Sequence, residues 1–155
     1  MSTVIKGAKL LGEQVADIRI EDGVITQIGA DLTGDTVIEA AGLIALPGLV
    51  DLHTHLREPG REDAETVLTG TKAAARGGFT CVFAMANTDP VADTAGVVEQ
   101  VWRLGREHGY ADVQPIGAVT IGLAGEHLAE LGAMADSAAK VRVFSDDGKC
   151  VSDAV

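Results

Sequence analysis

Residues 49–60 read Leu-Val-Asp-Leu-His-Thr-His-Leu-Arg-Glu-Pro-Gly, an apolar run that passes directly into a polar loop. The run predicts a buried strand, and the side chains of an extended strand alternate between its two faces. His53 and His55 are therefore expected to point the same way, about 6.6–7 Å apart along the strand. Neutral imidazole is the commonest metal ligand in proteins. Two histidines at the end of a strand that enters a loop indicate a metal site rather than two structural histidines.

The pattern changes on either side of this stretch, from short strands to strands that alternate with helices. Before it lie four β-rich runs, at residues 4–11, 15–21, 24–28 and 36–39. The dipeptide Asp22-Gly23 between two of these runs is a strong hairpin signal. After it, β-rich and helix-like runs alternate, at residues 49–53, 64–76, 79–84, 94–108, 113–119, 127–136 and 141–145. This alternation predicts a parallel sheet with right-handed crossovers.

The number of strands suggests an incomplete barrel. Four strands of this kind are half of a (β/α)8 barrel, which needs about 250 residues. We therefore predict an α/β fold in which residues 49–155 form the N-terminal half of a TIM-like barrel. Residues 1–48 would form a small β module that belongs to a composite β-sandwich. The alternative is a complete four-stranded α/β domain, but its last strand would leave a sheet edge that needs cover.

Composition excludes several classes of partner. The 155 residues carry a formal net charge of −11, whereas binding to nucleic acid or anionic membranes needs clustered Lys and Arg. The two cysteines, Cys81 and Cys150, form no Cys-x-x-Cys motif or disulfide framework. No signal-peptide pattern and no run of 18 apolar residues is found. We expect a cytoplasmic protein without nucleic-acid or membrane partners.

Other polar residues follow the predicted strands. Asp146 and Asp147 come after the fourth strand, on the same rim as the two histidines, where a carboxylate could be a third ligand or a bridge between two metals. The alternative is an Asp-Gly turn. Arg57 could bind an anion bidentately, or pair with a neighbouring glutamate in the loop. Asn87 could offer an amide to a polar substrate, or serve as a turn residue.

Four segments together resemble the dihydroorotases, a family of the cyclic amidohydrolase superfamily. They are Asp-Leu-His-Thr-His-Leu-Arg-Glu-Pro-Gly at 51–60, the segment 69–80, Met-Ala-Asn-Thr at 85–88 and Phe-Ser-Asp-Asp-Gly at 144–148. The last segment resembles the corresponding motif of the bacterial type I branch. Within these segments the chain departs from the family at Ala86, where the family usually has Pro, and this change is expected to loosen the turn that holds Asn87.

The resemblance implies a metal-dependent hydrolase barrel that interconverts (S)-dihydroorotate and N-carbamoyl-L-aspartate in de novo pyrimidine (UMP) biosynthesis. It implies a zinc site of one or two ions, with His53 and His55 on one metal and Asp147, the second Asp of the pair, bridging to another. His55, Arg57 and Asn87 match substrate-binding positions. A metal that lowers the pKa of bound water would generate the hydroxide that attacks the ring amide. Two further metal histidines and the catalytic Asp are expected beyond residue 155, so this chain alone is expected to be an inactive fragment.

Two alternatives stay open. The protein could be another cyclic amidohydrolase, a dihydropyrimidinase or allantoinase; in dihydropyrimidinases a carboxylated lysine bridges the metals, and Lys140 is the candidate. It could also be a catalytically inactive dihydroorotase-like scaffold for aspartate carbamoyltransferase, but the presence of all three expected ligands argues against this. The resemblance further implies a small-molecule substrate, a homo-oligomer and an association with aspartate carbamoyltransferase. His108 and His127, near predicted helix ends, are expected at the surface rather than in the site.

Overall fold

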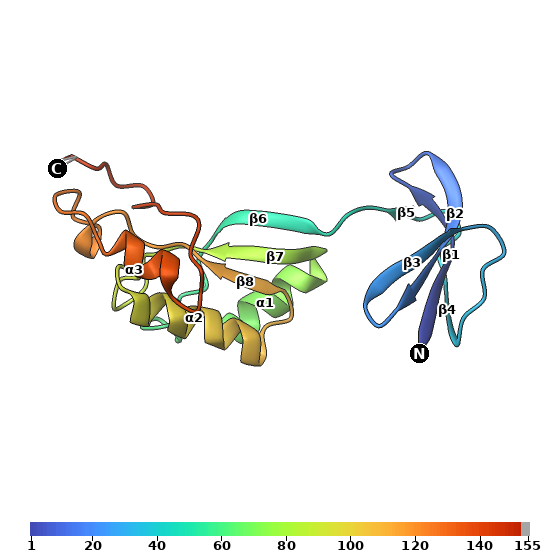
Figure 1. Cartoon of the computed structure of the whole chain (residues 1–155), viewed down its shortest axis with the longest axis horizontal. Helices are drawn as coiled ribbons and strands as arrows, with labels where there is room; N and C mark the ends of the chain where they lie inside the picture. The colour runs from blue at the N-terminus through green and yellow to red at the C-terminus, as the bar shows by residue number, and fades with distance from the viewer. Residues whose placement is uncertain (153–155) are drawn as a thin grey trace. The chain divides into compact units, whose positions relative to one another are not determined.

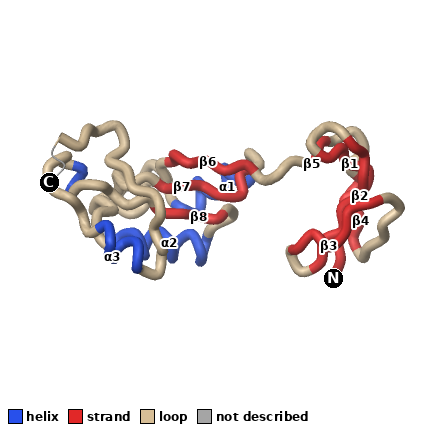
Figure 2. The backbone as a smooth tube through the Cα atoms, turned by 45° about the horizontal axis from the view of Figure 1, so that its top comes forward, coloured by secondary structure: helices blue, strands red, loops and turns tan. Residues whose placement is uncertain are grey.

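The computed structural model describes residues 1–152, which form two compact units. The first is Met1–Pro47 and the second begins at Gly48, one residue before the predicted boundary. Residues 153–155, the end of the second predicted domain, lie outside the described residues. Each unit has its own sheet (Figure 2). The chain is thus of mixed α/β class, and no helix within residues 1–152 has both the length and the apolar character of a membrane span.

The first unit is a five-stranded sheet built around β1 (Ser2–Leu10). β1 pairs with β2 (Gln14–Glu21), which pairs with β3 (Val24–Gly29), and both pairings are antiparallel. On its other side β1 pairs in parallel with β4 (Thr36–Glu39) and β5 (Ile44–Ala45). Asp22 and Gly23 join β2 and β3 with φ of 49° and 78°. Positive φ at both central residues is what a two-residue hairpin of type I′ requires, so the predicted hairpin is confirmed.

A buried carboxylate organises the first unit. Asp17 on β2 accepts hydrogen bonds from the backbone N–H groups of Gly7, at 2.9 Å, and Leu32, at 3.0 Å. These bonds stabilise the ionised form, and the bond from Gly7 contributes most to lowering the pKa of Asp17. Gly7 lies where the register of β1 against β2 shifts, so one side chain secures both a bulge and the loop after β3.

The second unit repeats a strand–helix pattern. Its parallel sheet has the order β6 (Leu49–Thr54), β7 (Phe79–Ala84), β8 (Asp112–Pro115). The crossovers contain α1 (Val67–Arg76) and α2 (Ala95–His108), which lie together against one face of the sheet (Figure 1). A 3₁₀ turn, η1 (Ile121–Leu123), and a short helix, α3 (Leu131–Asp136), follow. The predicted alternation is confirmed for the first three strands.

Helix α1 begins later than the helix-like run predicted at residues 64–76, and its first residues show why. Thr66 has extended backbone geometry, and its hydroxyl accepts a hydrogen bond from the N–H of Thr69 at 3.1 Å. The Thr69 hydroxyl in turn accepts from the Thr66 N–H at 3.1 Å. This reciprocal capping box starts the helix at Val67 instead of Ala64. Gly77 and Gly78 end it, as predicted.

The prediction of a fourth strand at residues 141–145 is wrong, because only one bridge forms there, between Gly117 and Phe144. Gly117 donates to Val143 and accepts from Ser145, as in a parallel ladder. On one side of this bridge Pro115 has no N–H to donate. On the other side of the bridge, the N–H of Val119 donates to the side chain of Asp146, so it is not available for a longer ladder. The predicted strand 113–119 likewise ends at Pro115.

The expected burial of the histidine strand is not seen within residues 1–152. Leu49, Val50 and Leu52 of β6 are 46%, 52% and 65% exposed. β6 pairs only with β7, so one edge of β6 has no partner among the described strands. The buried side chains of the second unit lie instead between the sheet, α1, α2 and α3, among them Val98, Val101, Val113, Met134 and Val141.

Two glycines of α2 should respond oppositely to a methyl group. A Cβ on Gly105 would lie 2.5 Å from the Cβ of Val113, whereas one on Gly96 would meet nothing within 4 Å. We expect Gly105→Ala to destabilise the protein by about 1–3 kcal/mol through overpacking of α2 on β8. Gly96→Ala should raise stability by up to about 1 kcal/mol. Urea denaturation of the full-length protein tests this, and equal midpoints for the two variants would contradict the close helix–strand contact.

Candidate metal centre

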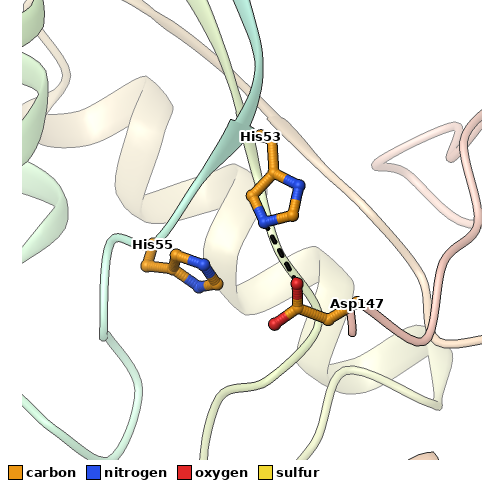
Figure 3. A group of neighbouring side chains, drawn as sticks. All are labelled: His53, His55 and Asp147. Carbon is orange, nitrogen blue, oxygen red and sulfur yellow. Dashed lines mark ion pairs between the residues drawn. The ribbon is translucent and has the colours of Figure 1, made fainter. Parts of the chain in front are cut away.

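The two histidines of the opening stretch lie side by side at the C-terminal end of β6. Their ring centroids are 5.1 Å apart and the rings meet edge to face at 69°. Both rings point toward Asp147, which the chain brings in from the loop after the Gly117–Phe144 bridge (Figure 3). The period-2 alternation of strand β6 puts both imidazoles on one side, and the close packing of loops at the end of the sheet supplies the carboxylate.

The donor atoms of this group are close enough to share one ion. One ligand atom from each of His53, His55 and Asp147 lies within 4.8 Å of the others. Nε2 of His53 is 3.0 Å from Oδ1 of Asp147. Two ligands on one zinc ion, with bonds of 2.0–2.2 Å, are about 3–4 Å apart, so small side-chain rotations would satisfy it. The side chain of His53 is 56% exposed, which leaves room for more ligands. Two imidazoles and a carboxylate fit a zinc site.

The adjacent carboxylates of Asp146 and Asp147 have different surroundings. Asp146 is 3% exposed and accepts hydrogen bonds from the N–H groups of Val119, at 2.8 Å, and Thr120, at 3.0 Å. The Thr120 hydroxyl donates to the other carboxylate oxygen of Asp146. Asp147 has a left-handed φ of 59°, and its N–H donates to the hydroxyl of Ser145 at 3.0 Å. Asp146 therefore anchors the loop, and Asp147 faces the histidines.

Asn87 lies between two members of the cluster. Its Oδ1 is 2.9 Å from Nδ1 of His55, and its Nδ2 donates to Oδ2 of Asp147 at 3.1 Å. The sequence pattern suggested a substrate contact or a turn residue, and neither interpretation includes this bridge. Residues 87 and 147 are 60 positions apart, so no local spacing signals the contact.

Arg57 follows His55 by two residues and is half-buried, with a left-handed φ of 62°. Its guanidinium forms no hydrogen bond or ion pair with any residue from 1 to 152. The alternative partners are engaged elsewhere: Glu58 accepts from the N–H of Val67 and Glu62 from that of Gly60, both at 2.8 Å. The head group of Arg57 is thus available for an anion.

Neither His108 nor His127 belongs to the cluster, and Lys140 has a hydrogen bond of its own elsewhere. Lys140 is exposed, and its ammonium donates to the carbonyl of Asp136 at 3.0 Å. His108 is exposed, 3.8 Å from a carboxylate oxygen of Glu107. His127 is also exposed, and it lies in a loop instead of the predicted helix. The surface positions expected for both histidines are confirmed.

Comparison with known proteins identifies relatives. Residues 42–154 match a family described as dihydro-orotase-like. The chain is 70% identical over 155 residues to the dihydroorotase of Streptomyces coelicolor and 57% identical over 158 residues to that of Mycobacterium tuberculosis. Each alignment covers 99% of this chain and 36% of the relative. The chain thus spans about a third of the length of these curated relatives.

Solved structures share the fold. An L-hydantoinase (dihydropyrimidinase) from Arthrobacter aurescens aligns with a TM-score of 0.70 at 24% identity, over 78% of this chain and 29% of that one. A D-hydantoinase aligns with a TM-score of 0.66 at 31% identity, over 78% of this chain and 28% of that one.

The different surroundings of the two aspartates lead to a prediction about metal affinity. In the full-length protein we expect Asp147→Asn to weaken zinc binding at least 10- to 100-fold. That is the typical effect of losing a residue that only hydrogen-bonds to a metal ligand, and loss of a ligand itself should cost no less. Asp146→Asn keeps an acceptor oxygen for Val119 and Thr120, so its zinc affinity should stay near that of the unaltered protein. Competition with a chromophoric chelator measures both. Equal affinities for the two variants would show that Asp147 is not a ligand.

Proposed function

This chain belongs to the dihydroorotase-like family, and on that basis we propose that the full-length protein is a dihydroorotase of the bacterial type I branch. It would hydrolyse (S)-dihydroorotate reversibly to N-carbamoyl-L-aspartate, a step of de novo pyrimidine biosynthesis. The observation that carries the proposal is the convergence of His53, His55 and Asp147, whose ligand atoms lie within 4.8 Å of one another. The high identity to proteins named dihydroorotase supports the choice among cyclic amidohydrolases.

We propose zinc, as one or two ions, held here by His53, His55 and Asp147. When bound, the metal would supply Lewis acidity, which lowers the pKa of coordinated water toward about 7 and polarises a carbonyl oxygen. The protein's own contribution is to hold two neutral imidazoles and a carboxylate at one strand end, with one side open to a ligand. The proton-transfer residue is expected beyond residue 155.

Arg57 would recognise the substrate's carboxylate. A guanidinium binds a carboxylate through two parallel hydrogen bonds, which sets the orientation of the ligand as well as adding affinity. Arg57 follows His55 by two residues, so the anion would be held next to the reacting amide. A negatively charged substrate can bind a chain of net charge −11, because binding depends on the local electrostatic field at the site and not on the net charge of the chain. His55 and Asn87 match the other substrate-binding positions of the family.

The architecture proposed for the whole protein follows from the second unit. Residues 49–155 would form the first half of a TIM-like (β/α)8 barrel, and residues 1–48 part of a composite β-sandwich. Two observations support this: the strands have the parallel order β6-β7-β8, and apolar residues of β6 are exposed. The rest of a closed barrel would cover these residues and the free edge of β6. A cytoplasmic location, a homo-oligomer and an association with aspartate carbamoyltransferase stay predictions.

We expect the full-length enzyme to lose dihydroorotate hydrolysis on treatment with a chelator and to regain it when zinc is added. As a matched control, Arg57→Ala should keep its zinc and raise KM for dihydroorotate, because it removes the anion contact and leaves the ligands in place. Steady-state kinetics and metal analysis of the same samples distinguish the two effects. Full activity after exhaustive metal removal would refute the proposed chemistry.

A dihydropyrimidinase is the second candidate, because hydantoinases share this fold. In that branch a carboxylated lysine would bridge the metals, and Lys140 would have to supply it. The exposed ammonium of Lys140, bonded to the Asp136 carbonyl, favours the dihydroorotase assignment.

Lys140→Ala should therefore leave the zinc content of the full-length protein unchanged, since the side chain stands apart from the cluster. Elemental analysis after gel filtration gives the answer directly. Metal loss in Lys140→Ala, together with normal metal content in Asp147→Asn, would instead assign the protein to the dihydropyrimidinase branch.

A further inference from the structure

The geometry points to a positioning role for Asn87. We propose that its amide holds His55 in the tautomer whose Nε2 binds the metal, and at the same time orients the Asp147 carboxylate. This rests on the proposed function only in requiring that the cluster binds a metal. It goes beyond the substrate contact that the family resemblance implies for this residue.

The carboxylate of Asp147 fixes the orientation of the Asn87 amide. An ionised carboxylate can only accept hydrogen bonds, so the atom of Asn87 that faces it must be a donor. Nδ2 of Asn87 meets this condition, 3.1 Å from Oδ2 of Asp147. The opposite orientation of the amide would place two acceptor oxygens against each other. The carboxylate therefore dictates which way the amide points.

The orientation of the amide then dictates the tautomer of His55. Oδ1 of Asn87 lies 2.9 Å from Nδ1 of His55. A carbonyl oxygen only accepts, so Nδ1 must carry the hydrogen. In a neutral imidazole with Nδ1 protonated, the free lone pair is on Nε2, which becomes the metal-binding nitrogen. Metal-ligating histidines typically donate their other ring N–H to an oxygen in this manner.

The fold holds Asn87 in place independently of its side chain. The two preceding residues, Met85 and Ala86, are 3% and 0% exposed. The N–H of Met85 donates to the carbonyl of Thr54 at 2.8 Å, and the carbonyl of Ala86 accepts from Ala92 at 3.0 Å. The backbone of residues 85–86 is thus tied both to the histidine strand and to the following loop. A residue held this firmly can impose an orientation on its neighbours.

The test compares three variants of the full-length protein. Asn87→Ala removes both hydrogen bonds. Asn87→Asp has the same shape and keeps an acceptor for His55, but it places a second carboxylate against Asp147. Thr88→Val is the control, since the Thr88 hydroxyl donates to the carbonyl of Pro90 and is not bonded to the cluster. Zinc affinity is measured by chelator competition, and the His55 tautomer by the ring ¹⁵N shifts of metal-free protein labelled at histidine.

We expect Asn87→Ala to weaken zinc binding roughly 10- to 100-fold and to lose the Nδ1–H preference of His55. Asn87→Asp should keep that tautomer, because its carboxylate still accepts from Nδ1 of His55, whereas Thr88→Val should match the unaltered protein in both. Unchanged zinc affinity and tautomer in Asn87→Ala, with only a higher KM, would overturn the proposal and assign Asn87 to substrate alone. Neither readout depends on turnover, so absence of dihydroorotate hydrolysis would refute the proposed function separately.

Discussion

The parallel pairing of β6 with β7 is the contact on which the candidate site depends. It brings the ends of two strands to the same edge, and a hydrogen bond from the N–H of Met85, just past the end of β7, reaches the carbonyl of Thr54, the last residue of β6. His53 and His55 leave β6 at this edge, and Asn87 leaves β7 there. Without this register the amide of Asn87 could not reach His55, and the histidines would face solvent without an orienting partner.

A second constraint is the buried carboxylate of Asp146. Removing an acidic side chain from water is costly unless hydrogen bonds replace the lost hydration. Here two backbone N–H groups and the Thr120 hydroxyl do so. The same bonds interrupt the ladder beyond Gly117 and fix the loop that carries Asp147. The carboxylate of Asp146 thus helps both to end the ladder and to hold the loop that carries Asp147.

The local elements of the fold were largely predictable. The hairpin at Asp22-Gly23, the strand Phe79–Ala84 and the Gly-Gly end of α1 depend on turn geometry and on β-branched or helix-forming residues, which act over a few positions. The start of α1 and the segment 141–145 were predicted wrongly, because side-chain bonds there compete with the backbone pattern. In the first case the competing bonds come from the capping box at Thr66, and in the second from Asp146, whose partners lie 26 and 27 residues away.

The sequence by itself determined that His53 and His55 share a face, since the alternation of an extended strand needs no information from elsewhere in the chain. It also placed Arg57 next to them, two residues further on. Only the tertiary structure decided that Asp147 faces the histidines, that Asp146 is enclosed by Val119 and Thr120, and that Asn87 bridges His55 to Asp147. These relations join residues 26 to 94 positions apart, and such contacts arise from packing of loops at the end of a sheet, which no local period encodes.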